Sequence, residues 1–164
     1  MHVQKNENKI KDVLEQMVKV QQRSDDAERY SRRWNLRLYG KKETPGENIR
    51  EVIMKLFVAL APEDKEKLDF LVDTVHRVGV VRDNSTRPVI IQFTMRAFRN
   101  KIWKVSCDNN TLKEKKLFLK EDLTQADRME RNRLWPIVEE ARKQGKRAGF
   151  RGPHAYIEGK KVTR

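Results

Sequence analysis

The chain has 164 residues, of which 37% are hydrophobic and 37% are charged, and its formal net charge is +13. This length allows one or two small domains with an extension, and the absence of any run of 18 apolar residues argues against a membrane span. The single cysteine, Cys107, excludes an internal disulfide and a cysteine-rich zinc site.

The excess of positive charge predicts an acidic polymer as partner, with nucleic acid as the first candidate. Residues 123–164 carry 11 basic and 5 acidic side chains, which makes this segment the most positive per residue. The first residues are polar, so we expect no signal peptide, and the lone cysteine suits an intracellular location.

Residues 3–31 contain neither proline nor glycine and follow a heptad pattern. With Ile10 at position a, the apolar residues at a, d and one e position form a seam: Val3, Ile10, Val13, Leu14, Met17 and Val20. The seam predicts a coiled coil over residues 1–33, in which a trimer is favoured and a dimer stays open. A single amphipathic helix packed on its own domain is the alternative interpretation.

From Trp34 the hydrophobic period changes, and residues 34–122 alternate between strand and helix patterns. The predicted elements are a strand at 35–39, a helix at 48–60, a short helical piece at 63–68, strands at 71–79 and 88–94, a helix at 95–107, a break at 108–110 and a strand at 117–119. This βαββαβ order predicts a ferredoxin-like antiparallel sheet, as in RNA-recognition motifs, with helices on one face and the other face open.

Residues 123–164 predict a small αββ domain, so the fold class of the whole chain is α+β. Thr124 is the expected N-cap of a helix that reaches about Gln144, with a kink or break after Trp135 because Pro136 follows. Strands are expected at 147–158 and 161–163, with a turn at Gly159-Lys160.

Residues 31–40 read Ser-Arg-Arg-Trp-Asn-Leu-Arg-Leu-Tyr-Gly. This junction resembles that of the first-open-reading-frame proteins of LINE-type (non-LTR) retrotransposons, where a coiled coil runs into an RNA-recognition motif through Ser-Arg-Arg-x-Asn-Leu-Arg-hydrophobic-hydrophobic-Gly. The resemblance extends to residues 76–79, 87–93, 118–124 and 133–152, and covers residues 26–164 in all. Members of the family can carry an extension before the coil.

The resemblance implies a homotrimeric protein that binds single-stranded RNA and acts as a nucleic-acid chaperone. Such proteins coat the RNA of their element as a cytoplasmic ribonucleoprotein, with the nucleus as a second location, and support retrotransposition. Single-stranded DNA is expected to bind as well, since phosphates and base faces are common to both polymers. No cofactor, metal or membrane is implied.

The usual RNA-recognition signature is missing from the strand at 88–94, where Phe93 is the one aromatic residue and is expected in the core. Tyr39 is the best candidate for base stacking, so binding should depend mainly on arginine and lysine contacts to phosphates. The full set of predicted nucleic-acid-binding residues is Arg32, Arg33, Arg37, Tyr39, Arg77, Arg82, Arg87, Lys101, Lys104, Arg131, Arg133, Lys146, Arg147, Phe150 and Arg151. The alternatives are a surface charge paired with a neighbouring acid for Arg37, a salt bridge at the end of the coil for Arg32 and Arg33, and an ordinary solubilising charge for Lys101 and Lys104. Trp135 is expected in the core.

Two other classes of function compete with nucleic-acid binding. A basic coiled-coil adaptor that binds an acidic protein would share the composition, and the salt dependence of RNA binding would separate the two. An enzyme is disfavoured, because the sequence has no His-carboxylate cluster, glycine-rich phosphate loop, nucleophile elbow or metal-ligand spacing.

Overall fold

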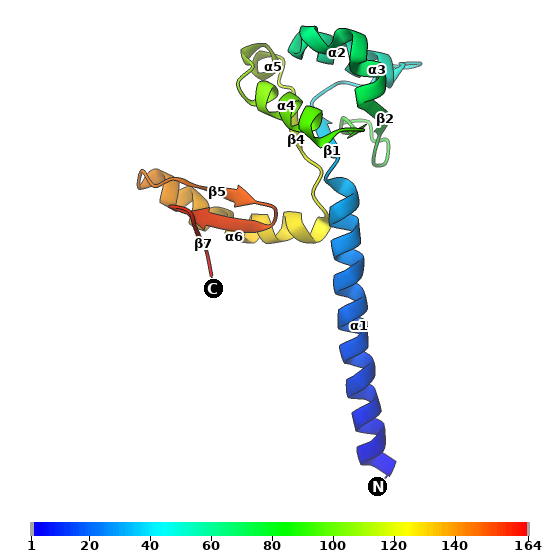
Figure 1. Ribbon diagram of the computed structural model, residues 1–164, viewed down its shortest axis with the longest axis vertical. Coiled ribbons are helices and arrows are strands. Elements are labelled where there is room, and N and C mark those ends of the chain that lie inside the picture. The colour runs from blue at the N-terminus through cyan, green and yellow to red at the C-terminus, as the bar shows by residue number, and fades with distance from the viewer. Residues whose placement is uncertain (1, 164) are drawn as a thin grey trace. The chain divides into compact units, whose positions relative to one another are not determined.

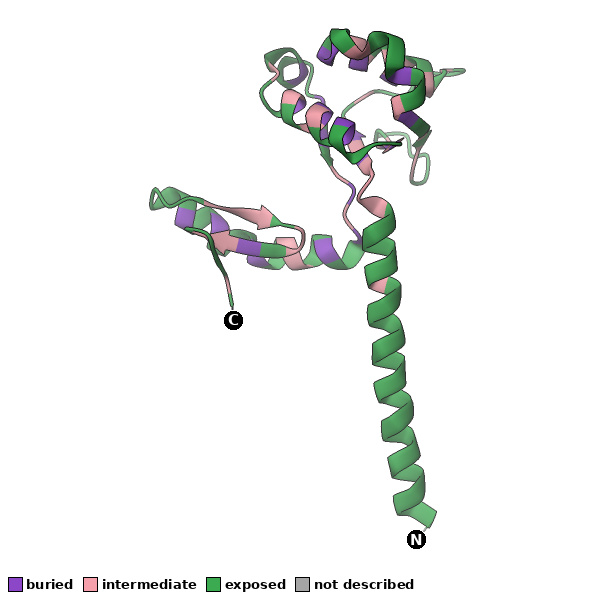
Figure 2. Ribbon diagram, in the orientation of Figure 1, coloured by how far each residue is buried: buried purple, intermediate pink, exposed green. Residues whose placement is uncertain are grey.

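The first element of the computed structural model, which describes residues 2–163, is the helix α1 (His2–Arg32; Figure 1). This 31-residue helix buries none of its residues, and nearly its whole length is exposed (Figure 2). Within residues 2–163, no helix is both long and apolar enough to span a bilayer.

Contacts divide the chain into two units, each with its own hydrophobic core. Residues Arg32–Asp122 form one unit, and Met1–Ser31 with Leu123–Arg164 form the other. The chain is therefore α+β, with a long first helix followed by helices and antiparallel sheets.

The unit Arg32–Asp122 is built on a four-stranded antiparallel sheet of order β2-β3-β1-β4. Its strands are β1 (Asn35–Tyr39), β2 (Val72–Arg77), β3 (Val89–Phe93) and β4 (Phe118–Glu121), close to the predicted ranges. Gly40 follows β1, and its φ of +90° and its approach to the Lys116 carbonyl leave no room for a side chain.

Five helical segments connect these strands. They are α2 (Ile49–Leu60), the 3-10 helix η1 (Pro62–Lys67), α3 (Leu68–Leu71), α4 (Arg96–Cys107) and α5 (Asn110–Glu114). The sequence predicted α2 and α4 closely but missed α5, because Asn109 was read as part of a break. Asn109 is instead the N-cap of α5, and its side chain accepts a hydrogen bond from the Leu112 N–H.

Helices α2 and α4 pack on one face of the sheet. Leu36, Leu38 and Ile91 point to this face and are fully or almost fully buried. Phe93, 2% exposed, stacks on Phe57 with ring centroids 5.6 Å apart, so its predicted place in the core is confirmed. The opposite face of the sheet carries the alternate residues of each strand.

The C-terminal segment folds as α6 (Gln125–Lys143), β5 (Ala148–Arg151), β6 (His154–Ile157) and β7 (Lys160–Lys161). Thr124 caps α6 as predicted, by accepting a hydrogen bond from the Asp127 N–H. The expected single strand at 147–158 was wrong. The chain reverses after Arg151, where Gly152 has a φ of +56° and Pro153 follows, so three strands form where two were expected.

Two further expectations about α6 need correction. The helix is not broken at Pro136, which is exposed, so water can bond the Asn132 carbonyl that proline leaves without a helical donor. Trp135 is not a core residue, because it is 45% exposed. The core here consists of Leu134, Val138 and Ala155.

Candidate nucleic-acid interface

Arg32 and Arg37 converge on one buried carboxylate. Asp122, just beyond β4, has a side chain that is 1% exposed and accepts hydrogen bonds from Arg32 at 3.1 Å, Arg37 at 3.0 Å and Asn35 at 3.0 Å. We expected Arg37 on an exposed face, but its side chain is only 12% exposed. Its alternative interpretation, a charge paired with an acid, describes the contact with Asp122, although the pair is mostly buried and not at the surface.

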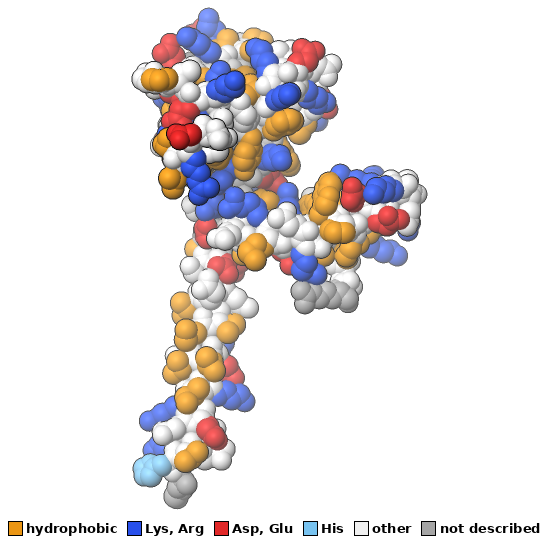
Figure 3. Space-filling view, turned by 180° about the vertical axis from the view of Figure 1, so that it is seen from behind, with side chains coloured by type: hydrophobic (Ala, Val, Ile, Leu, Met, Phe, Trp, Pro, Cys, Tyr) orange, Lys and Arg blue, Asp and Glu red, His pale blue; other side chains and the backbone are white. Residues whose placement is uncertain are grey.

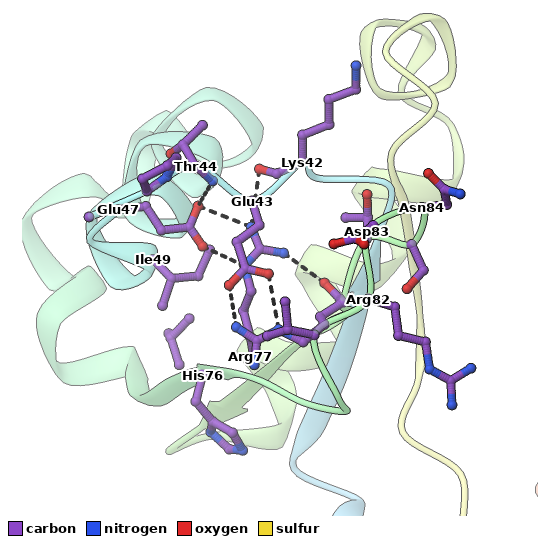
Figure 4. Close-up of a pocket in the computed structure, with 17 residues that line it drawn as sticks. Lys42, Glu43, Thr44, Glu47, Ile49, His76, Arg77, Arg82, Asp83 and Asn84 are labelled. Carbon is purple, nitrogen blue, oxygen red and sulfur yellow. Dashed lines mark hydrogen bonds and ion pairs between the residues drawn. The ribbon is translucent and has the colours of Figure 1, made fainter.

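Arg77 and Arg87 also face acidic partners. Arg77, with a side chain 4% exposed, donates to both carboxylate oxygens of Glu47, at 2.5 and 3.1 Å, and to the carbonyls of Lys41 and Arg87. Arg87 pairs with Glu43. These bonds tie the loop after β1 to the loop before β3, around a hollow of about 900 Å³ (Figure 4). Arg77 was predicted to bind nucleic acid beside the loop between β2 and β3, and the structure buries its side chain against Glu47.

These pairs shift the protonation of the acids. Hydrogen bonds from Arg77 hold the pKa of Glu47 below its usual value, and Arg87 does the same for the pKa of Glu43. In the other unit, the hydrogen bonds from Arg29 lower the pKa of the buried Asp127.

Two more predicted contacts are occupied by carboxylates. Lys101 bonds Asp64 at 2.5 Å and Glu63 at 2.6 Å, and these hydrogen bonds raise its pKa. Arg133 pairs with Glu130 one turn earlier in α6. Each of these cations must give up an acidic neighbour before it can bind a phosphate with full charge.

The remaining predicted cations are more accessible. Arg82, Lys104, Lys146, Arg147 and Arg151 are exposed, and within residues 2–163 no carboxylate forms an ion pair with their side chains. Three of the five lie between α6 and the end of β5, in the segment with the highest positive charge density. In the view of Figure 3, Lys and Arg side chains, drawn in blue, are visible on the surface of both folded units.

The open face of the sheet carries one aromatic pair. Tyr39 lies opposite Phe118 in the register of β1 and β4, and Phe118 is 49% exposed. Lys120, on the same face of β4, places its ammonium group 5.6 Å from the centre of the Tyr39 ring. Sequence reasoning found Tyr39 but missed Phe118 and Lys120. Side chains alternate between the two faces of a strand, so the predicted strand at 117–119 already put Phe118 on the face away from its buried neighbour Leu119. This alternation could have identified Phe118.

The C-terminal unit pairs arginines with aromatic rings. The guanidinium carbon of Arg131 lies 5.3 Å from the centre of the Phe150 ring, and that of Arg151 lies 5.1 Å from the centre of the Tyr156 ring. In the unit Arg32–Asp122, the guanidinium carbon of Arg33 lies 4.3 Å from the centre of the Trp34 ring. Sequence reasoning selected Arg131, Phe150 and Arg151 but not Tyr156. The arrangement offers flat π surfaces beside fixed positive charge, which suits unpaired bases and their phosphates.

No family model matches the sequence, and no curated protein matches it either.

The first prediction concerns Asp122, the buried carboxylate to which Arg32, Arg37 and Asn35 donate hydrogen bonds. Asp122→Ala should lower the free energy of unfolding by about 3 kcal/mol, because Arg32 and Arg37 lose the carboxylate that compensates their partial burial. Urea unfolding followed by circular dichroism measures this. Asp83→Ala, at an exposed loop acid, is the matched control and should stay within about 0.5 kcal/mol. If Asp122→Ala lowered the free energy of unfolding no more than the control does, the stabilising role of Asp122 would be contradicted.

The second prediction concerns how the stability of the protein depends on pH. The folded pKa of Glu47 is depressed, so the stability that it contributes is present above the unfolded value, near 4.5, and is lost as pH falls through the folded value. Glu47→Gln should therefore destabilise the protein at pH 7, and the gap to wild type should narrow below about pH 4.5. Unfolding curves from pH 7 to pH 3 test this, with the exposed Glu66→Gln as control. A gap that does not change with pH would refute it.

Proposed function

We propose that this protein binds single-stranded nucleic acid, RNA in the first place, and acts as a nucleic-acid chaperone of a LINE-type retrotransposon. The observation that carries the proposal is the pairing of partly exposed aromatic rings with arginine or lysine in both units. In this proposal the protein coats the element's RNA as a cytoplasmic ribonucleoprotein, with a second location in the nucleus. It needs no cofactor and catalyses no reaction.

The sheet of the unit Arg32–Asp122 supports an RNA-recognition-motif-like domain. The order β2-β3-β1-β4, with two helices on one face, matches the ferredoxin-like arrangement of that motif. Its open face departs from the usual pattern, because β3 offers Ile90 and Gln92 in place of stacking aromatics. The aromatic pair lies instead on β1 and β4, at one edge of the sheet.

Contacts to phosphates would come mostly from the accessible cations of the C-terminal segment. Lys146, Arg147 and Arg151 have no ion pair to break within the described part of the chain, so their charges are available to an incoming strand. Such contacts are independent of sequence and weaken repulsion between strands. Both properties are needed by a chaperone that must bind, release and anneal different strands.

The exposed seam of α1 supports association into a coiled coil. Val3, Ile10 and Val20 are 60–70% exposed, and hydrophobic side chains follow the helix in Figure 3. An isolated helix with such a stripe gains little stability in water, whereas partner helices would bury it. The extra apolar residue Leu14 widens the stripe and favours three helices.

Salt dependence tests the proposed binding. A labelled single-stranded RNA of about 25 nucleotides should bind more tightly than a duplex of the same length. Its logarithmic affinity should fall against logarithmic salt with a slope of about −3 if about four phosphates are contacted. Fluorescence anisotropy at several salt concentrations measures both.

Arg151→Glu should weaken this binding, whereas Lys55→Glu changes the charge equally on α2, at a residue already paired with Glu51, and should have little effect. Weak binding that does not distinguish single strand from duplex would instead favour a basic coiled-coil adaptor with an acidic protein partner.

The oligomeric state gives a separate prediction. Wild type should sediment as a trimer, and Ile10→Asp should dissociate it because a charge would enter the apolar seam. Gln22→Asp, at the outward position f, is the matched control and should leave the trimer intact. Analytical ultracentrifugation distinguishes the species. A monomeric wild type would refute the coiled coil.

A further inference from the structure

Four planar side chains of the C-terminal unit form one continuous stack. The rings of Trp135 and Phe150 are nearly parallel, with centroids 6.3 Å apart and an interplanar angle of 13°. Arg131 lies over Phe150 at 5.3 Å, and Arg142 lies over Trp135 at 5.5 Å. The contacts therefore run in the order cation, ring, ring, cation, and the 6.3 Å between centroids means that the two rings are offset and cover each other only in part.

The sequence arranges this stack through the helical period. Arg131, Trp135 and Arg142 are separated by four and seven residues, so they share one face of α6. Phe150 joins them from β5, whose residues alternate between the two faces of the hairpin sheet.

Backbone carbonyls fix the two arginines. Arg131 donates from Nε to the Gly152 carbonyl at 2.6 Å, and Arg142 donates from Nε to the Ala148 carbonyl at 2.9 Å. Within residues 2–163 no carboxylate forms an ion pair with Arg142. The guanidinium groups are thus oriented before any ligand arrives, which lowers the entropy cost of binding.

The stack holds the hairpin against α6, but that role does not account for its exposure. Trp135 is 45% exposed, while the apolar contacts of the unit centre on Leu134, Val138 and Ala155. A tryptophan that served packing alone would be expected to bury most of its large surface. Here an indole remains accessible beside a preset positive charge.

We propose that the Arg131–Phe150–Trp135–Arg142 stack is a base-stacking site, in which one unpaired nucleobase packs on the exposed part of the Trp135 ring that Phe150 and Arg142 leave uncovered, while an arginine contacts an adjoining phosphate. This rests on the proposed binding of single strands and specifies where a base is held. The charge fits a phosphodiester on either side of the ring, and the flat apolar surface fits any base. Bases inside a duplex are already stacked and would not reach it.

The test uses the full-length chain with 5-fluorotryptophan at its three tryptophans, Trp34, Trp103 and Trp135. The ¹⁹F resonance of Trp135 is the one that disappears in Trp135→Phe. Titration with a 12-nucleotide oligouridylate should shift this resonance, whereas an abasic phosphodiester of equal length should leave it in place. Stacking on one base also predicts that Trp135→Ala weakens oligouridylate binding about tenfold, while Trp135→Phe retains most of the affinity.

Met129→Ala is the matched control, since Met129 is 64% exposed on the same helix, and it should bind like wild type. Equal affinity for the base-bearing and abasic strands, with an unmoved Trp135 resonance, would overturn the stacking site while the proposed function survives. Failure of both strands to bind would overturn both. A shift of the same size with polyglutamate would assign the surface to an acidic protein and also overturn the proposal. If Trp135→Ala unfolds by circular dichroism, the resonance shift and Trp135→Phe still decide.

Discussion

The buried carboxylate of Asp122 is the constraint on which the unit Arg32–Asp122 depends. A carboxylate with 1% of its side chain exposed must be neutralised, and it is neutralised by Arg32, at the end of α1, and Arg37, in the middle of β1. Because Asn35 donates to the same group, the start of β1 is held in register with the residue that follows β4. The fold closes the unit by joining its two ends through charge, where an apolar contact would have given less orientation.

Ion pairing divides the positively charged side chains of the protein into two kinds. Arginines that face acids, such as Arg77 with Glu47, position loops and strands, and their charge is largely cancelled at short range. Cations without such partners, such as Arg147 and Arg151, keep their full field for an external anion. The formal charge of +13 therefore overstates what the sheet offers to a polyanion and understates the role of the C-terminal segment.

Local sequence patterns predicted most helices and strands well, but they could not predict which side chains far apart in the sequence form pairs. Alternation gave the strand at 35–39, and the spacing of apolar residues gave α2, because both signals lie within a few neighbouring residues. The partner of Arg37 is 85 residues away, so no local pattern distinguishes this arginine from a free one. The missed hairpin is a local error of another kind. Gly152-Pro153 is a turn signal, but it stands inside an apolar alternation that was read as one strand.

Stacking and phosphate contacts respond differently to salt, and a protein that uses both can bind without being locked in place. Phosphate contacts weaken as ions compete, whereas a base on an aromatic ring is largely insensitive to ionic strength. In the proposed function, if three chains associate through α1, a bound strand would meet several such sites at high local concentration, and modest affinities would combine into a long-lived complex. Individual sites can still release and rebind during that lifetime. Exchange at single sites within a persistent assembly is what annealing of two strands requires, since each base must leave the protein before it can pair.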